Sequence, residues 1–178
     1  FQDLTSELGV LSDASRTSMQ VLFHDFNEDG FPDLFVANDT DANGFYLNRG
    51  DGTFKVFSGP SGLSTTDGSM GIAIGDINND GLTDIVYTNY AAEVNSVAYL
   101  IDNKSSNDGY LRNAVFTQSF DSPIINKLSW PKISWGPGLF DLDNDGDLDL
   151  FFANGHLNSV SGDNRQSNLL FKSLKFVI

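Results

Sequence analysis

The sequence of 178 residues contains no cysteine and little positive charge. Without cysteine, disulfide bonds, thiolate metal sites and cysteine nucleophiles are all excluded. Ten lysines and arginines stand against 24 aspartates and glutamates, which gives a formal net charge of −14 at pH 7. A surface of this charge repels phosphate backbones and anionic lipids, so we expect neither nucleic acid nor a membrane surface as a partner.

Long apolar runs are also missing. None approaches the roughly 18–20 residues of a membrane span, so we expect no membrane insertion. The first residue is Phe1 and no basic-then-apolar leader follows it, which predicts a processed chain or a fragment from which any signal peptide has been removed. Hydrophobic residues nevertheless make up 40% of the chain, including 15 phenylalanines, so a folded core is expected.

One sequence pattern occurs three times. An apolar run, an acidic loop and a second apolar run recur in this order in residues 19–39, 70–90 and 133–155. The first aspartates of the three loops, Asp25, Asp76 and Asp141, are separated by 51 and 65 residues. Internal repeats of this size are typical of architectures in which similar units lie side by side.

Each repeat reads as short strands. Apolar or alternating runs of five to seven residues, bounded by Asp, Asn and Gly, predict strands near residues 19–25, 33–38, 44–48 and 53–58. Glycines within residues 48–52 supply the positive φ of a tight hairpin. Four such strands form one antiparallel sheet, the size of a propeller blade. We therefore predict an all-β propeller segment with three four-stranded antiparallel repeats at about 1–52, 53–113 and 114–178.

The repeats begin part-way through a blade. The segment at Phe1 aligns with that at Phe54, with Gly9 on Gly62, and so resembles a lone fourth strand. The chain ends around a third strand at residues 168–172, and residues 174–178 are either an extension of it or the start of another outer strand. Propellers have about four to eight blades, and three cannot close a ring. Blades from the missing part of the same chain, a second copy, another chain and an open arc all remain open as explanations.

The acidic loops share the pattern D-x-[DN]-x-D-G-x-x-D. Side-chain oxygens occupy positions 1, 3, 5 and 9, glycine at position 6 allows a sharp turn, and the backbone carbonyl at position 7 offers a fifth ligand. Such a set suits Ca²⁺ better than the smaller Mg²⁺, so we expect about three Ca²⁺ ions, one per repeat. The candidate ligands are Asp25, Asn27, Asp29, Phe31 and Asp33; Asp76, Asn78, Asp80, Leu82 and Asp84; and Asp141, Asp143, Asp145, Asp147 and Asp149.

Two alternatives explain the loops less well. An EF-hand requires glutamate at position 12, but Val36, Tyr87 and Phe152 stand there within strand-like runs. Asp, Asn and Gly also populate ordinary turns, although three loops in register argue against turn chemistry alone. Because Asp143 replaces the asparagine of the other two loops, the third loop is expected to bind most tightly.

These residues resemble the FG-GAP/VCBS repeats of integrin-α-like β-propellers, and more narrowly the ASPIC/UnbV and cartilage-acidic-protein group. The matching segments are residues 1–10, 46–54, 135–156 and 168–172. The resemblance implies a secreted or periplasmic, Ca²⁺-stabilised propeller, usually of about seven blades, that mediates adhesion or partner binding. The chain departs from this pattern in having only three repeats.

The expected function is therefore that of a non-enzymatic scaffold for adhesion or protein interaction. No Ser-His-Asp order, phosphate-binding glycine loop or dinucleotide fingerprint is present, and we expect no catalytic residues. The expected partner is a protein or further propeller blades. The alternative is a carbohydrate-binding or polysaccharide-lyase-type propeller, in which Trp130, Trp135 and Tyr90 stack on sugar rings rather than pack between blades.

Overall fold

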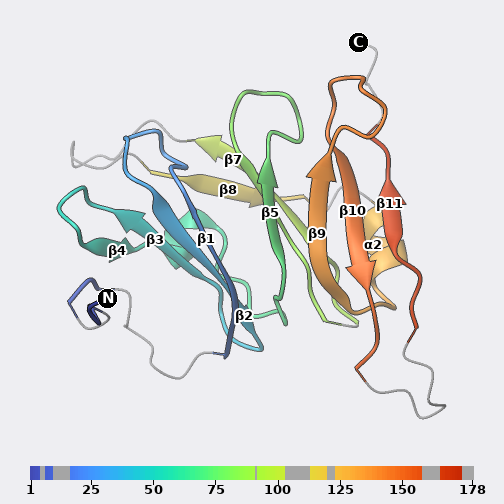
Figure 1. Ribbon diagram of the computed structural model, residues 1–178, viewed down its shortest axis with the longest axis horizontal. Helices are drawn as coiled ribbons and strands as arrows, with labels where there is room; N and C mark the ends of the chain where they lie inside the picture. Colours follow the sequence, from blue (N-terminus) through green and yellow to red (C-terminus); the bar gives the residue numbers. More distant parts are fainter. Residues whose placement is uncertain are drawn as a thin grey trace.

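Three antiparallel sheets stand side by side in the computed structural model, which describes residues 1–4, 7–9, 17–90, 92–102, 113–119, 123–157 and 165–173 (Figure 1). The first sheet consists of β1 (Thr17–His24), β2 (Asp33–Asp39), β3 (Gly44–Asn48) and β4 (Phe54–Val56). The second consists of β5 (Ile72–Gly75), β6 (Asp84–Tyr87), β7 (Ser96–Asp102) and β8 (Val115–Gln118). The third contains β9 (Ser134–Phe140), β10 (Asp149–Asn154) and β11 (Leu169–Phe171).

The predicted fold class is confirmed. Each sheet is a run of sequential strands joined by antiparallel pairing, in the orders β1-β2-β3-β4, β5-β6-β7-β8 and β11-β10-β9. Two short helices, α1 (Ser58–Ser61) and α2 (Pro123–Ser129), follow β4 and β8. In the third sheet the described residues supply three strands, and residues 174–178, where the sequence leaves a further outer strand open, lie outside the described part.

The sequence repeats are offset from the sheets by one strand. β4 pairs with β3 and β8 pairs with β7, although β4 and β8 each lie at the start of the next predicted repeat. The opening segment lies against β4, because the amide of Phe54 donates to the carbonyl of Leu8 at 2.9 Å, but its described residues, 1–4 and 7–9, do not form the fourth strand expected there. A Cβ on Gly9 would lie 2.9 Å from the carbonyl oxygen of Phe54, and one on Gly62 would lie 2.5 Å from that of Phe116. The two glycines therefore occupy matching places against successive outer strands.

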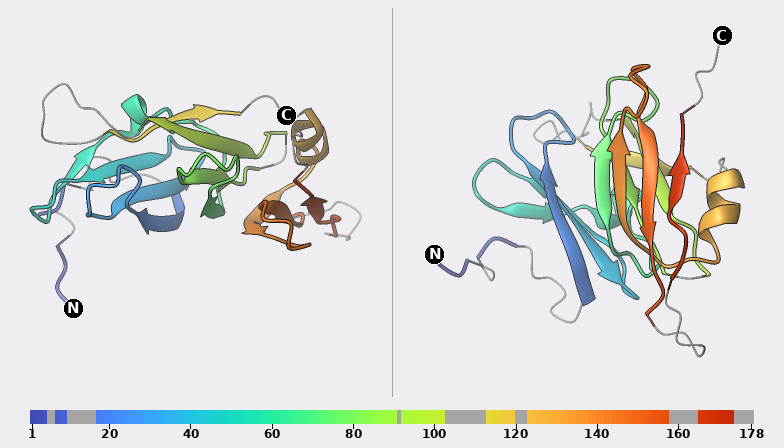
Figure 2. Two further views of the ribbon diagram at one scale, coloured as in Figure 1. Left: turned by 90° about the horizontal axis from the view of Figure 1, so that it is seen from above. Right: turned by 45° about the vertical axis from the view of Figure 1, so that its right-hand side comes forward.

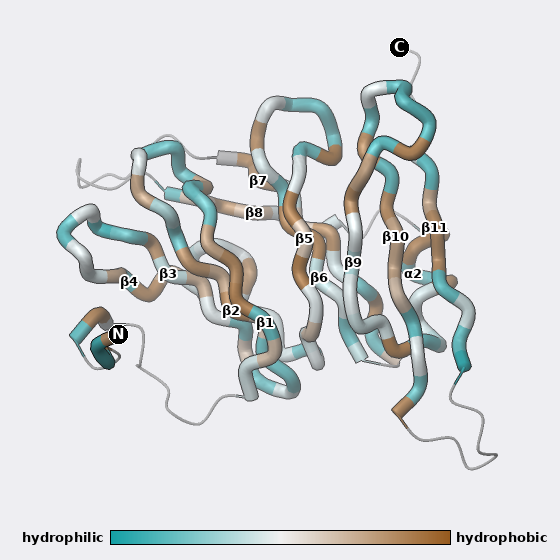
Figure 3. The backbone as a smooth tube through the Cα atoms, in the orientation of Figure 1, coloured by the Kyte–Doolittle hydropathy of each residue, from teal (hydrophilic) through white to brown (hydrophobic). Residues whose placement is uncertain are grey.

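The main core lies between the first and second sheets. Phe35 and Tyr87 face each other with ring centroids 5.8 Å apart, and Phe45 meets Phe116 at the same separation. These side chains alternate along their strands with residues of the opposite face, as the pleat requires. Figure 3 shows that hydrophobic residues are concentrated along the strands. A smaller cluster, which includes Val86 and Phe152, lies between the second and third sheets.

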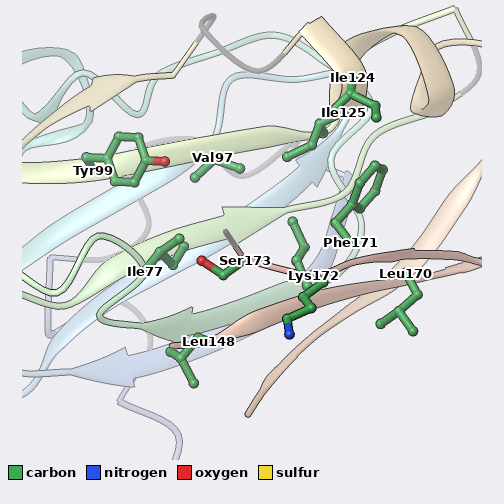
Figure 4. A pocket seen from close by; sticks show the side chains of 11 residues that line it. Ile77, Val97, Tyr99, Ile124, Ile125, Leu148, Leu170, Phe171, Lys172 and Ser173 are labelled. Atoms are coloured by element: carbon green, nitrogen blue, oxygen red, sulfur yellow. The ribbon is translucent and has the colours of Figure 1, made fainter. Parts of the chain in front are cut away.

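A cavity of about 340 Å³ remains between the second and third sheets (Figure 4). Ile77 and Val97 line one side, at the positions that Phe26 and Phe45 hold in the first sheet. There the space is filled by Phe116 of β8, whose ring lies 5.5 Å from that of Phe26. The cavity therefore lies where an outer strand of the third sheet would pack.

The first strands of the sheets, β1, β5 and β9, converge at one side of the molecule, and β8 and the helices lie at the other (Figure 2). The side-chain carbonyl of Gln20 in β1 accepts a 2.8 Å hydrogen bond from the amide of Ile72 in β5. Gly71 allows the next close approach, because a Cβ there would lie 2.4 Å from the carbonyl oxygen of Trp135. The first strands of neighbouring sheets are thus joined by a hydrogen bond in one case and by a close approach that requires glycine in the other.

Buried asparagine and serine side chains form a second link between the sheets. The amide of Asn38, at the end of β2, donates to the Oδ1 of Asn43 at 2.9 Å. The Nδ2 of Asn43 donates to the Oγ of Ser69 at 3.1 Å, and this hydroxyl donates to the Oδ1 of Asn89 at 2.9 Å. Asn89 lies just after the end of the second sheet's β6, so the chain of hydrogen bonds crosses from one sheet to the next.

The same link recurs between the second and third sheets. The Nδ2 of Asn95 donates to the Oγ of Ser134 at 2.8 Å, and this hydroxyl donates to the Oδ1 of Asn154 at 2.6 Å. The sequence contains a signal for this link that the loop motif alone does not reveal. A serine stands seven residues before the first aspartate of every acidic loop, and an asparagine thirteen residues after it.

Candidate metal centres

The three acidic loops occupy the same place in the three sheets. Each connects the first strand to the second, at the upper end of the molecule in Figure 1. Position 9 of each loop is also the first residue of the second strand: Asp33 begins β2, Asp84 begins β6 and Asp149 begins β10. All three predicted sites are therefore strand-to-strand loops rather than helix-flanked ones.

The aspartate at position 1 closes each loop through its own backbone. In the first loop, Asp25 accepts hydrogen bonds from the amides of Asp29 at 3.0 Å and Gly30 at 2.8 Å. Asp76 and Asp141 accept the matching pairs at 2.9–3.0 Å in the other loops. Backbone amides thus hold both oxygens of this carboxylate toward the inside of the turn.

The aspartate at position 9 joins three strands of its sheet. Asp33 accepts hydrogen bonds from the amide of Phe26 at 3.2 Å and from that of Asn48, at the end of β3, at 2.9 Å. Asp84 and Asp149 form the equivalent bonds at 2.8–2.9 Å. The three carboxylates are at most 1% exposed, so each is a buried acid anchored by backbone donors.

Two left-handed residues shape each loop. The residues at position 4, Glu28, Asn79 and Asn144, have φ of 54–58°, and the glycines at position 6 have φ of 85–92°. No atom lies within 4 Å of a Cβ built on these glycines, so backbone conformation rather than space requires glycine there. The three loops therefore share one backbone shape as well as one sequence pattern.

Burial raises the pKa of two of the position 9 carboxylates, Asp33 and Asp84. The pKa of Asp33 is raised to about 7, chiefly by burial; the backbone donors lower it, and the charges of Asp29 and Asp25 add to the rise. The pKa of Asp84 rises to about 6 for the same reasons. A cation beside such groups would offset both the loss of hydration and the mutual repulsion.

The third loop differs from the first two in its charged contacts. One oxygen each from Asp141, Asp143 and Asp149 lie within 4.8 Å of one another. The Nζ of Lys172 forms a hydrogen-bonded ion pair with Asp143 and lies 3.8 Å from an oxygen of Asp145. The hydrogen bond to Asp143 raises the pKa of Lys172. In the first two loops the asparagine at position 3 instead donates to the aspartate at position 5, at 2.9–3.0 Å.

Position 7 residues point to different neighbours in the different loops. Phe31 lies against the hairpin after β3, where a Cβ on Gly50 would come within 2.7 Å of its ring. The side chain of Asp147 accepts a 2.9 Å hydrogen bond from the Nδ2 of Asn79, which belongs to the second loop. The second and third loops are therefore in direct contact. The predicted role of the position 7 carbonyls stays a prediction.

The donor set of the loops fits Ca²⁺. Every predicted side-chain ligand is a carboxylate or an amide, so the loops offer oxygen donors without sulfur or imidazole. Buried Asp33 and Asp84 with raised pKa values add a local need for positive charge. These are the features expected of a site for a hard divalent cation.

Comparisons with known proteins agree with this geometry. Residues 25–87, from the first acidic loop to the end of β6, match the family model of the FG-GAP-like repeat. The chain contains FG-GAP-like repeats. The matched segment contains two of the three acidic loops and most of the first two sheets. The resemblance inferred from the loop motif is confirmed, and the three antiparallel sheets of three or four strands are consistent with FG-GAP propeller blades.

The chain is also similar to cartilage acidic protein 1 from several vertebrates. It is 31% identical to the Xenopus tropicalis protein over 125 residues, which are 68% of this chain and 17% of that protein. It is 31% identical to the Homo sapiens protein over 144 residues, or 80% of this chain and 19% of that protein. The Mus musculus protein is 29% identical over 144 residues, or 80% of this chain and 20% of that protein. The FG-GAP-like chain thus spans about a fifth of the length of these relatives.

Among the described residues of this FG-GAP-like chain, no helix has the length and apolar character needed to cross a bilayer.

Sequence reasoning missed Lys172 as a member of the third site. It lies 29 residues beyond Asp143 and contacts it only because β11 pairs beside β10. The hydrogen bonds to the position 9 aspartates show which residues of the second and third sheets are equivalent. Ser173 donates to Asp149 as Leu100 donates to Asp84, so Lys172 occupies the place that Tyr99 holds in the second sheet.

Proposed function

We propose that this chain is a calcium-binding, non-enzymatic propeller module that acts outside the cytoplasm as a rigid scaffold for adhesion or protein interaction. The observation that carries the proposal is the shared geometry of the three loops. In each loop a buried position 9 aspartate and a backbone-held position 1 aspartate face the same turn. Three matching acidic turns are costly without a cation, which is why calcium is the proposed ligand.

The proposed ligands are the side chains at positions 1, 3, 5 and 9 and the backbone carbonyl at position 7. When bound, Ca²⁺ supplies positive charge that offsets the repulsion among the carboxylates. Position 9 also accepts an amide from the third strand, as Asp33 does from Asn48, so ligand binding and sheet pairing depend on the same carboxylate. Calcium affinities of about 10⁻⁴ to 10⁻³ M suit extracellular modules, which supports a secreted or periplasmic location.

The proposed partner surfaces are the two open faces at the ends of the row of sheets. Val21 and Phe23 of β1 are more than half exposed, and Phe23 pairs with Leu34 on the face turned away from the second sheet. Phe140 and Leu170 are exposed on the third sheet. Apolar faces and strand edges of this kind are usually covered in a native assembly. Further blades or a protein partner are the proposed occupants.

Exposed aromatic side chains support a second candidate, carbohydrate binding. Trp130 is 54% exposed and Trp135 is 38% exposed, so neither is buried between sheets as packing would require. The Nε1 of Trp135 donates to the carbonyl of Gly155 at 2.8 Å, which fixes its ring at the surface. A glycan array probed with the protein and with Trp130→Ala and Trp135→Ala would test this candidate. Loss of a glycan signal in these variants would favour it over the protein-interaction function.

Isothermal titration with CaCl₂ tests the main proposal. We expect about three bound ions per chain, with weaker binding of MgCl₂ because Mg²⁺ requires tighter octahedral geometry. Asp76→Ala should remove one ion, because it deletes the carboxylate that accepts amides from Asp80 and Gly81. The matched control is Asp51→Ala, which removes an exposed acid that bonds Thr53 in a hairpin. Absence of calcium binding in the unmodified protein would contradict the proposal.

A further inference from the structure

A lysine side chain from outside the third loop forms ion pairs with its acidic residues. The ammonium group of Lys172 forms an ion pair with Asp143 at position 3 and lies 3.8 Å from an oxygen of Asp145 at position 5. Both aspartates are predicted metal ligands. A lysine ammonium is a compact charge with three donors, and it can stand where an oxygen-lined site expects a metal ion.

Among the described residues, this arrangement is found in the third sheet and in neither of the other two. The residue before the amide that binds the position 9 aspartate is Leu47 in the first sheet, Tyr99 in the second and Lys172 in the third. Leucine and tyrosine contribute no cation. In the first two loops, the position 5 aspartate receives a neutral amide instead, from Asn27 or Asn78.

The charges of the loops show what Lys172 changes. The first two loops have three charged side-chain ligands each and the third has four, because of Asp143. Lys172 returns the net charge of the third ligand set to that of the others. It also engages two of the oxygens that Ca²⁺ would need, so binding there requires the ammonium group to move.

We propose that Lys172 is a built-in competitor of Ca²⁺ in the third loop, which makes this loop the weakest calcium site of the three and the one that keeps its shape without calcium. This inference rests on the proposed calcium-binding function. It also reverses the expected order of calcium affinities. The number of carboxylates alone made the third loop the tightest site, because it included Asp143 but not the opposing charge of Lys172. Without calcium, the carboxylates of the third loop are partly compensated by the ammonium group of Lys172, whereas the first two loops have no such lysine among their described contacts.

The test is a CaCl₂ titration of ¹⁵N-labelled protein followed by NMR. The position 6 glycines Gly30, Gly81 and Gly146 report one loop each, because their amides donate to the position 1 aspartates. In the unmodified protein, Gly146 should respond at the highest calcium concentration. Lys172→Met keeps the length of the side chain and removes its charge, and it should lower the apparent Kd at Gly146 about tenfold.

The control variant is Lys132→Met. Lys132 has the same charge but donates to the Oγ of Ser167 at 2.9 Å, on an exposed surface outside the acidic loops. It corrects for the general effect of removing one positive charge, and it should leave all three glycine responses within about twofold of the unmodified protein. A second readout is melting in EGTA, where Lys172→Met should melt at a lower temperature than Lys132→Met.

The outcomes separate the inference from the proposed function. If Gly30 and Gly81 respond to calcium while Gly146 is equally sensitive in the unmodified protein and in Lys172→Met, the competitor role is overturned and the calcium function stands. If no glycine responds in any protein, the calcium function is overturned and the inference falls with it. A shift confined to Gly146 in Lys172→Met supports both.

Discussion

Each position 9 aspartate has a structural role in its sheet and a proposed role in metal binding. Each accepts backbone amides from the loop and from the third strand, and each is a predicted metal ligand. The hydrogen bonds of the sheet therefore hold Asp33 and Asp84 in buried positions that are unfavourable for a negative charge, and this burial raises the pKa of both. A carboxylate in this situation is stabilised either by a proton or by a metal ion.

This exchange predicts a pH dependence of stability that changes sign with calcium. In EGTA, the pKa of Asp33 is about 7 in the folded protein and has its ordinary value of 3.8 in the unfolded chain, so the folded protein binds more protons between these values. Its contribution to the free energy of unfolding is favourable at low pH and is lost as the pH rises through 7. With calcium bound, protons compete with the metal, and the same group favours folding at higher pH.

The measurement is chemical denaturation from about pH 5 to 8, in EGTA and in CaCl₂. Comparison with Asp33→Asn isolates this group from other titrating residues, because the amide cannot ionise. In EGTA, the free energy of unfolding of the unmodified protein should decrease relative to that of Asp33→Asn as the pH rises. A flat difference in EGTA would contradict the raised pKa.

At the level of strands and loops, the sheets are joined by polar links as well as by apolar packing. Ser69 shows how one side chain serves two sheets, because its Oγ accepts from Asn43 of the first sheet and donates to Asn89 of the second. The Nδ2 of Asn89 in turn donates to the carbonyl of Val94 at 2.6 Å. Asn89 and Ser69 are both buried, so the bonds of this link satisfy donors and acceptors that have no access to water.

Asn89→Ala should therefore destabilise the protein by about 2–4 kcal/mol, because it leaves buried partners in the strand-end turn and at Ser69 without their hydrogen bonds. The control is Asn168→Ala, which removes an exposed asparagine of the third sheet, whose Oδ1 accepts from the amide of Asn154 as that of Asn95 accepts from Asn89. It should cost about 1 kcal/mol or less. Urea denaturation measures both. Equal losses for the two variants would contradict a buried link between sheets.

The strands of the first repeat were predictable from the sequence because their signals are local. Apolar alternation and turn residues gave boundaries near those of β1 (Thr17–His24) and β4 (Phe54–Val56). The acidic loops were predictable for the same reason, since all ligands of one loop lie within nine residues. Lys172 and the asparagine–serine links were not, because they depend on which strands lie side by side. Helix α2 (Pro123–Ser129) was also missed, since its seven residues offer little helical periodicity.

For the whole molecule, the three sheets form a row with an acidic loop on each and an open apolar face at either end. The loops of the second and third sheets touch through Asn79 and Asp147, and Gln20 joins the first two inner strands. The second and third loops thus share a direct contact, and the first and second sheets share one between their inner strands. Calcium is expected to act on the stability of the row rather than on single hairpins.

Chelation should consequently lower the melting temperature of the whole chain. At a free calcium concentration about 100 times the Kd, each occupied loop adds about 2.7 kcal/mol to the free energy of unfolding. For a chain of this length, 1 kcal/mol corresponds to roughly 2–4 °C, so each loop accounts for about 5–10 °C. Calorimetry in EGTA and in CaCl₂ measures the difference. Asp76→Ala should reduce it by the share of one loop, and Asp51→Ala should leave it unchanged. Equal melting temperatures of the unmodified protein in EGTA and CaCl₂ would contradict the proposal that calcium stabilises the sheets, because the buried aspartates would then tolerate one another without a cation.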